Sequence, residues 1–347
     1  MKCYFAVTAP DSEKNVYVSL LEVALKSARL NTTLDLYVLY DGPREHKCYQ
    51  ILKEYNVNII EHKFSHTAEI AKLFTTDFVG RPLKVNQITC TFMRLDVPFI
   101  EQEDEYVLYS DFDVVFTKDI NVEELPKPKY LAASSEFTME RKMAEYFNAG
   151  VMVFNVKNMR EKCKLIFKDL EEGKVINGFD QGYLNEHCKE DYEWLDIKFN
   201  WKPYWGINHD ASIVHYHGMK PGSEVAESGY GMTDDVLAYT MTSEKSMAGY
   251  AYYYMLYFHL SASSEAFWTN WLSNFLAHAY ELSMTRLLQN AEQQKEKELQ
   301  QKEKEFLQEK YKRKIRLYRV LNICSLGLSI YHNRKKLKKL KKKVESM

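Results

Sequence analysis

The chain of 347 residues contains few cysteines, and none of them lies close to another in the sequence. Because they form no CxxC pair, the pattern indicates packed thiols in a reducing compartment and argues against a disulfide framework or a zinc site. The six positions are Cys3, Cys48, Cys90, Cys163, Cys188 and Cys324.

The sequence also lacks an excess of one charge sign and a long apolar run. Its formal net charge is -1, which argues against nucleic acid as a partner. The most apolar segment near the end, residues 320–330, is shorter than the roughly 20 residues that a membrane-spanning helix needs. Met1-Lys2 leads directly into a strand-like run, which leaves no room for a signal peptide. We therefore expect a cytoplasmic protein.

Apolar residues, by contrast, make up 46% of the chain, enough to build a sizeable core. In residues 1–222, apolar runs alternate with segments of helical spacing, which indicates an α/β domain with a mainly parallel sheet covered by helices on both faces. The runs CYFAVTA, LDLYVLYDG and VNII predict strands, and residues 16–28 and 43–55 predict helices.

Two further regions follow this domain. Residues 223–290 are rich in aromatics and predict a helical extension packed on the domain or on a partner. Residues 291–347 predict a charged helix and then a basic amphipathic tail. A short apolar stripe between basic clusters suits an anionic membrane surface. The alternatives are a solvated tail and a helix that pairs with another protein. The C-terminal helices would also allow an oligomer.

Two carboxylates interrupt the apolar run YVLYSDFDVVF, residues 106–116. A buried charge is costly unless it is paired or binds a metal. Residues i and i+2 of an extended segment point the same way, so we expect Asp111 and Asp113 to face one site beyond the strand. Hard oxygen ligands of this kind suit Mn²⁺ or Mg²⁺. The alternative is a surface loop with incidental acids.

A second polar cluster follows the apolar strand in SIVHYHGMKPG, residues 212–222. His215 or His217 would complete a metal site at the end of that strand. Gly218 would allow the backbone to approach a phosphate closely, and Lys220 would supply a positive charge for it. The alternative is again a surface loop, in this case with incidental histidines.

Two segments between these clusters also carry polar residues in apolar surroundings. Asn148 and Gly150 interrupt the strand-like run FNAGVMVFNV, which suits a side chain aimed at a ligand. Asp180 and Gln181 open a predicted helix in NGFDQGYLNEH. Taken by itself, Asp180 is equally well explained as a helix N-cap.

Together, in this order, the four segments resemble the family-8 retaining glycosyltransferases over residues 3–222. The resemblance implies the GT-A fold, a Rossmann-like sheet that carries a DxD motif, and a helical C-terminal region follows it here. It implies that Asp111 and Asp113 hold Mn²⁺ (or Mg²⁺) with His215 as the third ligand. One residue separates Gly218 from Lys220, where the family usually has two, so His217 is a second candidate ligand.

The resemblance also implies contacts to a nucleotide-sugar donor. Arg94, in TFMRLDVPFI, would contact the donor and join Asp180 and Gln181 as the catalytic group. We assign Asp180 to orientation and charge stabilisation rather than to covalent chemistry, and Glu136 is a further candidate for sugar binding. The implied donor-binding residues are Ala6, Thr8, Arg94, Asn148, Gly218 and Lys220.

The resemblance implies a metal-dependent retaining hexosyltransferase that moves a hexose from a UDP-sugar to a glycan or glycolipid. Such an enzyme would serve lipopolysaccharide or capsule synthesis. The basic tail fits a place at the inner face of the membrane, where a lipid-linked acceptor would lie. Two alternatives remain open: a non-catalytic scaffold protein that binds a nucleotide-sugar, and an inverting GT-A transferase or nucleotidyltransferase that shares the metal site.

Overall fold

The computed structural model describes residues 1–12, 16–75, 85–141, 145–221, 243–261 and 292–316, together with isolated positions beyond them. The chain divides into two compact units, Met1–Ala279 and Tyr280–Met347. Much of the predicted aromatic-rich extension and nearly all of the predicted basic tail lie outside the described residues.

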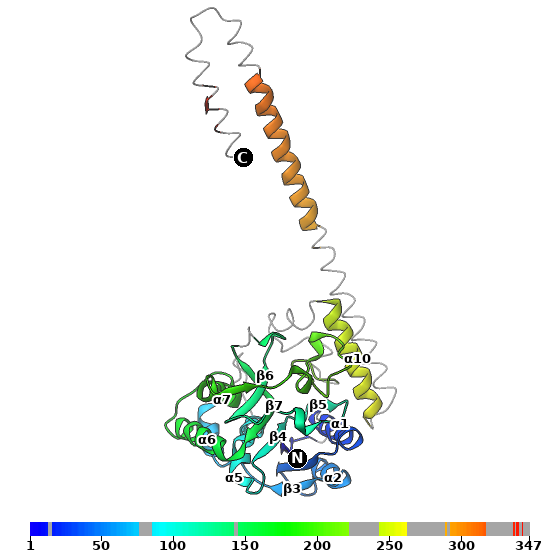
Figure 1. Cartoon of the computed structure of the whole chain (residues 1–347), viewed down its shortest axis with the longest axis vertical. Coiled ribbons are helices and arrows are strands. Elements are labelled where there is room, and N and C mark those ends of the chain that lie inside the picture. The colour runs from blue at the N-terminus through cyan, green and yellow to red at the C-terminus, as the bar shows by residue number, and fades with distance from the viewer. Residues whose placement is uncertain are drawn as a thin grey trace, which may run out of the picture. The chain divides into compact units, whose positions relative to one another are not determined.

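A seven-stranded sheet forms the centre of the first unit, in the order β3-β2-β1-β4-β7-β6-β8 (Figure 1). Strand β7 runs antiparallel to both of its neighbours, and the other four pairs are parallel. The strands are β1 Lys2–Thr8, β2 Asp35–Asp41, β3 Asn58–Glu61, β4 Tyr106–Ser110, β6 Leu131–Ser135, β7 Phe147–Asn155 and β8 Tyr192–Trp194. A separate two-stranded sheet pairs β5 (Val114–Phe116) with β9 (Ile213–His215).

Helices cover both faces of the large sheet, α1 and α2 on one face and α6 and α7 on the other (Figure 1). Alternate residues of β1 follow this division: Phe5 belongs to the core under α1 and α2, whereas Tyr4 and Ala6 belong to the opposite core. The predicted class, α/β with a mixed, mainly parallel sheet, is therefore confirmed. The helices among the described residues of this unit are α1 Val16–Asn31, α2 Lys47–Glu54, α3 Thr67–Leu73, α4 Val85–Phe92, α5 Val97–Ile100, α6 Val156–Glu171, α7 Phe179–Cys188 and α10 Glu244–Leu260.

Helix α2 begins later than the sequence pattern predicts. We expected a helix from residue 43, but it begins at Lys47 because His46 has an extended backbone and caps it. The Nδ1 atom of His46 accepts a hydrogen bond from the backbone N–H of Cys48 at 3.1 Å. Short 3₁₀ turns complete the connections: Met93–Asp96, Val122–Glu124, Ile197–Phe199 and Pro203–Trp205.

The run YVLYSDFDVVF forms two strands rather than one. Strand β4 ends at Ser110, the chain turns through residues 111–113, and β5 leaves the large sheet to pair with β9. In this antiparallel register Val114 lies opposite His215. The pairing therefore brings the turn between β4 and β5 beside the end of β9.

Helix α10 confirms the predicted helical character of the aromatic run at residues 250–260, and it supports the loop after β9. Its tyrosines at positions 250, 253, 254 and 257 are buried. Tyr250 donates a hydrogen bond to the His217 carbonyl at 3.2 Å, and Tyr254 donates to the Met219 carbonyl at 2.9 Å. These bonds hold the loop that carries the predicted phosphate-binding residues.

A buried carboxylate, Glu101, anchors the start of β1. It accepts hydrogen bonds from the Tyr4 hydroxyl at 2.6 Å and from Lys2 Nζ at 3.2 Å. The backbone N–H groups of Glu103 and Asp104 also donate to it, at 2.6 and 3.0 Å. Burial raises the pKa of Glu101, but these donors outweigh that effect and lower it to about 2.

We expect Glu101→Gln to reduce the free energy of unfolding by about 1–3 kcal/mol at neutral pH, because it weakens a buried, charge-assisted network. A lowered pKa means that this contribution is present above the ordinary value of 4.5 and is lost as the pH falls toward about 2. Denaturant unfolding at neutral pH and below pH 4.5 measures the difference, which should narrow at the lower pH.

Glu103→Gln is the matched control for this prediction. Glu103 pairs with the same Lys2 at 2.7 Å, but its side chain is 81% exposed. An exposed ion pair contributes little, so the control should change stability by less than about 0.5 kcal/mol. Equal losses in the two variants would contradict the assignment of Glu101 as the anchor.

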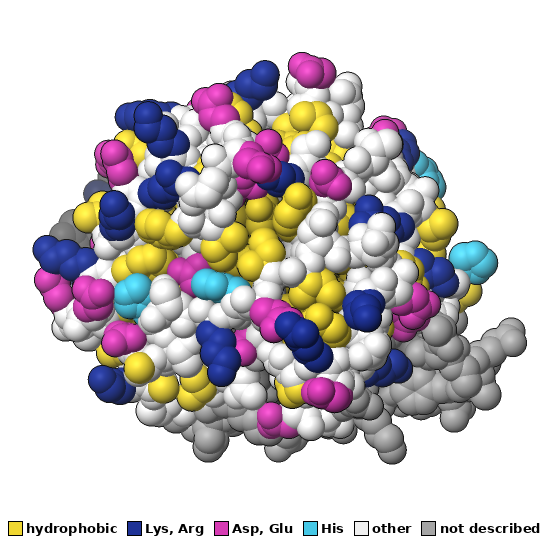
Figure 2. Space-filling view, turned by 90° about the horizontal axis from the view of Figure 1, so that it is seen from below, with side chains coloured by type: hydrophobic (Ala, Val, Ile, Leu, Met, Phe, Trp, Pro, Cys, Tyr) yellow, Lys and Arg dark blue, Asp and Glu magenta, His cyan; other side chains and the backbone are white. Residues whose placement is uncertain are grey.

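The second unit contains a described helix over residues 292–316, whose side chains are almost all exposed. Arg313 and Glu309 form an i,i+4 ion pair at 3.1 Å on it, in agreement with the predicted charged helix. Within the described ranges, we find no helix with both the length and the apolar character needed to cross a membrane. Figure 2 shows acidic and basic side chains interspersed over one face of the molecule, in line with the small net charge.

Candidate active site and metal centre

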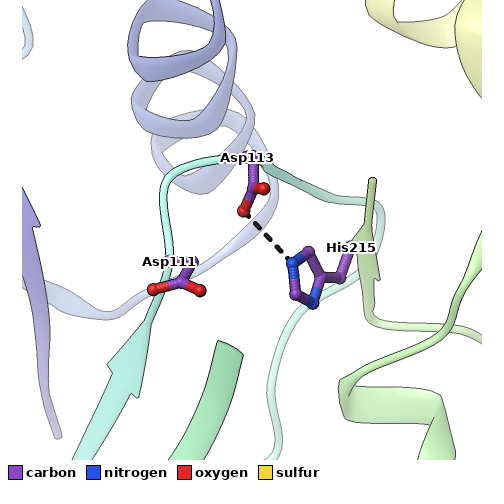
Figure 3. A group of neighbouring side chains, drawn as sticks. All are labelled: Asp111, Asp113 and His215. Carbon is purple, nitrogen blue, oxygen red and sulfur yellow. Dashed lines mark ion pairs between the residues drawn. The ribbon is translucent and has the colours of Figure 1, made fainter. Parts of the chain in front are cut away.

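Two carboxylates and one imidazole lie around a common space at the carboxyl end of β4. Asp111 and Asp113 come from the turn after this strand, and His215 comes from the end of β9 (Figure 3). One ligand atom from each residue lies within 4.8 Å of the others. The structure thus brings together the three residues that we predicted as metal ligands.

Burial and charged neighbours set the protonation of these three residues. Burial raises the pKa of Asp113, but Lys220 and His215 outweigh burial and hold it below its usual range. Burial raises the pKa of Asp111 to about 7 against the opposing effect of Arg94, with the Asp113 carboxylate adding to the increase. Burial lowers the pKa of His215 to about 4, so the imidazole is neutral at neutral pH, as a metal ligand must be.

One atom of the group tests whether a divalent ion fits. Asp113 Oδ1 is buried and lies 3.2 Å from His215 Nε2, yet it accepts no hydrogen bond from any residue that the structure describes. A buried acceptor without a donor costs about 1–3 kcal/mol, which a bound cation offsets. Carboxylate oxygens with an imidazole nitrogen are a donor set that suits Mn²⁺ or Mg²⁺.

Arg94 is buried between two of the predicted acids. Its Nη2 atom donates to Asp111 Oδ1 at 2.8 Å, and its Nε atom lies 3.0 Å from Asp180 Oδ2. Its guanidinium lies over the Tyr109 ring, 4.7 Å from the centroid, and also donates to the Ala149 carbonyl. Burial lowers the pKa of Arg94, but the two carboxylates outweigh it, so the side chain stays charged.

A second polar cluster centres on Glu136. Asn148 Nδ2 and Gln181 Nε2 both donate to Glu136 Oε2, at 2.7 and 3.0 Å. Gln181 Oε1 accepts from the backbone N–H of Ala149 at 2.8 Å. Burial raises the pKa of Glu136, but His217 and other partners lower it to about 2, so it remains a carboxylate. Three residues that we predicted to face the donor sugar therefore lie in contact.

His217, the alternative ligand, belongs to this second cluster. Its Nε2 atom lies 2.7 Å from Glu136 Oε1, and its Nδ1 atom lies 3.1 Å from the Tyr204 hydroxyl. Both ring nitrogens thus have partners outside the three-residue group, which contains His215 and not His217.

A cavity of about 480 Å³ lies next to the acids, a volume typical of ligand sites. Six of the predicted residues line it: Ala6, Thr8, Arg94, Asp111, Asp113 and Lys220. Asp180 and His215 are not part of the lining but contact it through Arg94 and Asp113. Gly218, at φ +87°, lies in the loop after β9 and outside this lining, so its phosphate contact stays a prediction.

Lys220 reaches the acids despite the short spacing from Gly218. Its Nζ atom lies 2.5 Å from Asp113 Oδ2 and donates to the Tyr216 carbonyl at 2.8 Å. Burial lowers the pKa of Lys220, but Asp113 raises it more, so the ammonium stays charged beside the cavity.

Two further residues of the site escaped the sequence patterns. Tyr109, which looked like an ordinary strand residue, donates to Asp111 Oδ1 at 3.0 Å. Asn200 is fully buried and lies between Asn148 and His215. Nothing in its local sequence, FNWKPYW, indicates that Asn200 belongs to the candidate site. The position of Tyr109 two residues before Asp111, on the same side of the strand, was the one available signal.

The chain is similar to known proteins in sequence and in structure. The sequence model described as Glycosyl transferase family 8 matches residues 12–225. Among solved structures, the galactosyltransferase LgtC in complex with donor and acceptor sugar analogues is 20% identical, with a TM-score of 0.48 over 78% of this chain and 100% of that chain. No curated protein sequence matches.

Two other solved structures have similar TM-scores to this chain. The glycosyltransferase GlyE of Streptococcus pneumoniae TIGR4 is 22% identical, with a TM-score of 0.47 over 80% of this chain and 63% of that chain. Mouse xyloside xylosyltransferase 1 is 14% identical, with a TM-score of 0.46 over 63% of this chain and 98% of that chain. Because the family match alone covers more than half of the 347 residues, this chain belongs to glycosyl transferase family 8 and is a glycosyltransferase with the GT-A fold.

Proposed function

We propose that this glycosyltransferase is a metal-dependent, retaining hexosyltransferase that uses a UDP-sugar. The observation that carries the proposal is the group of Asp111, Asp113 and His215 at the edge of the cavity. These three residues would hold Mn²⁺ or Mg²⁺. When bound, such an ion supplies positive charge that stabilises a departing nucleotide diphosphate.

The chain's own residues supply the rest of the donor site. Lys220 adds a fixed positive charge at the cavity for the diphosphate. Asp180 Oδ2 is buried and pairs with Arg94 Nε at 3.0 Å, so Asp180 would act on the donor through the position and charge of Arg94, which lines the cavity. Asn148, Gln181 and Glu136 offer further polar groups beside Asp180. Ala6 and Thr8 line the cavity, which supports a role in binding the nucleotide base of the donor. Gly218 enters the proposal by resemblance alone.

Retention is the outcome that the resemblance implies, and Glu136 does not suit the role of base that an inverting enzyme needs. An inverting enzyme needs a carboxylate base near the acceptor. The pKa of Glu136 is about 2, because burial, which raises it, is outweighed by His217 and other partners, so it is a poor base. A non-catalytic scaffold would need neither the paired Arg94 and Asp180 nor a buried carboxylate oxygen, Asp113 Oδ1, that receives no hydrogen bond from the described residues.

The acceptor side of the proposal rests on the sequence. We place the enzyme in lipopolysaccharide or capsule synthesis, in the cytoplasm and peripherally at the inner membrane face, with a glycan or glycolipid acceptor. The apolar stripe and basic clusters of the tail support a membrane contact, and the C-terminal helices support an oligomer. We retain the division into a GT-A domain at residues 1–222, a helical extension at 223–290 and a charged tail at 291–347.

A donor panel tests the proposed reaction. The protein is incubated with UDP-hexoses and Mn²⁺, with free and lipid-linked glycans as acceptors, and UDP release is measured with and without a chelator. We expect turnover with a UDP-hexose that stops on chelation, and a product whose anomeric configuration by NMR equals that of the donor. UDP binding without turnover would favour the scaffold, and an inverted product would overturn the retaining assignment.

A further inference from the structure

A chain of four buried polar side chains connects the second cluster to the metal centre. Asn148 Nδ2 lies 2.7 Å from Glu136 Oε2, Asn200 Nδ2 lies 2.8 Å from Asn148 Oδ1, and Asn200 Oδ1 lies 3.0 Å from His215 Nδ1. All four residues are at most 8% exposed, and Asn200 is fully buried. Each hydrogen bond in this chain therefore forms away from water. Which group donates and which accepts is then set by the neighbouring side chains.

The orientation of the Asn148 amide is determined by two groups that have only one role each. The backbone N–H of Gly150 can only donate, and it lies 3.0 Å from Asn148 Oδ1. The Glu136 carboxylate can only accept, and it faces Asn148 Nδ2. The Asn148 oxygen therefore points toward Asn200. Asn200 must donate to it through Nδ2, and its own oxygen then points toward His215.

This direction determines where His215 carries its proton. An amide oxygen only accepts, so the proton of the neutral imidazole lies on Nδ1. Nε2 then presents a lone pair toward Asp113 Oδ1, 3.2 Å away (Figure 3). Asp113 Oδ1 receives no other hydrogen bond from the described part of the chain, so His215 Nε2 is its nearest polar neighbour there.

The ring of His215 is also held in place from one side. A Cβ atom added at Gly150 would lie 2.3 Å from His215 Cε1 and 2.6 Å from Nδ1, so the ring packs directly against a glycine backbone. No other residue type leaves that space. The imidazole is thus restrained in position by Gly150 and in protonation by Asn200.

We propose that Asn200 is a positioning residue that keeps the His215 proton on Nδ1 and thereby leaves Nε2 free as a ligand atom for the metal. The inference rests on the proposed metal-dependent function, and it adds a residue that acts on the ion only through His215. Outer residues that orient a ligating histidine typically change metal affinity by about 10- to 100-fold when they are replaced.

Nitrogen-15 NMR of the histidine rings in the metal-free protein tests the proton position directly. Ring signals of His215 are assigned by their loss in His215→Gln, and the protonated and unprotonated nitrogens are distinguished by their shifts. We expect Nδ1 to be protonated in the wild type. In Asn200→Leu, which has similar volume and no amide, we expect the proton to move at least partly to Nε2. Titration with Mn²⁺ alone, followed by electron paramagnetic resonance, should then show about 10- to 100-fold weaker binding.

Asn155→Leu is the matched control. Asn155 is a buried asparagine at the far end of β7, where it caps α6 and does not contact His215. The Asn155→Leu variant should be less stable than the wild type, but it should keep the proton on His215 Nδ1 and the wild-type Mn²⁺ affinity. A wild-type His215 protonated on Nε2 would overturn the proposal, even if Asn200→Leu does not fold. So would Asn200→Leu with an unchanged proton and affinity. A wild type that binds no Mn²⁺ would instead contradict the proposed function, and the ring-proton measurement would still decide the role of Asn200.

Discussion

Asp113→Asn is expected to reduce Mn²⁺-dependent UDP release by about 10²- to 10³-fold. The reason is that Asp113 serves two partners, with Oδ1 beside His215 and Oδ2 in contact with Lys220 at 2.5 Å. Asparagine replaces one of these oxygens with an NH₂ group, which neither binds a cation nor pairs with an ammonium. Steady-state kinetics with the preferred donor and a Mn²⁺ titration of the metal-free variant measure the two effects separately.

Asp210→Asn provides the control for this experiment. Asp210 carries the same side chain in an exposed ion pair with Lys118 at 3.1 Å, and it is 90% exposed. Its replacement should leave both the rate and the Mn²⁺ affinity unchanged. If Asp113→Asn is folded and retains wild-type turnover with Mn²⁺, the proposed metal site is wrong.

Arg94→Met is expected to lower the free energy of unfolding by about 3–5 kcal/mol, the largest stability change that we predict. Arg94 is 3% exposed and lies between the carboxylates of Asp111 and Asp180. Methionine fills a similar volume but leaves these two acids close together without a positive charge. Denaturant unfolding at neutral pH, followed by circular dichroism, measures the loss.

Arg44→Met separates the effect of burial from the loss of an arginine as such. Arg44 pairs with Glu61 at 2.6 Å, but the side chains are 69% and 48% exposed. Solvent screens such a pair, so we expect a change below about 0.5 kcal/mol. Similar losses in the two variants would show that the buried carboxylates do not depend on Arg94.

The order of elements was readable from the sequence because it follows from local patterns. The apolar runs at the start of the chain became β1, β2 and β3, and the helical spacing of residues 16–28 became α1. A strand buried on both faces, such as β1, needs a continuous apolar run, which is visible without knowledge of the neighbouring strands. The start of α2 was less well predicted because His46, an unusual cap, ends the preceding turn.

The choice between His215 and His217 as metal ligand could not be made from local sequence patterns. Two residues apart on an extended segment, both rings point to the same side, so alternation cannot distinguish them. The register of β5 and β9 distinguishes them, because it places Val114 opposite His215 and brings that ring to Asp113. His217 lies one step further along, where Glu136 and Tyr204 engage both of its nitrogens.

The sequence by itself determined the α/β class and the residues from which an acidic site with a histidine would be built. These depend on apolar periodicity and on residue type, which every short segment carries. The tertiary structure alone decided that Asp111 shares Arg94 with Asp180, that His215 is the histidine beside Asp113, and that Asn200 contacts it. Those contacts join positions far apart in the chain. They depend on strand register and on the direction of buried hydrogen bonds, which no local pattern encodes.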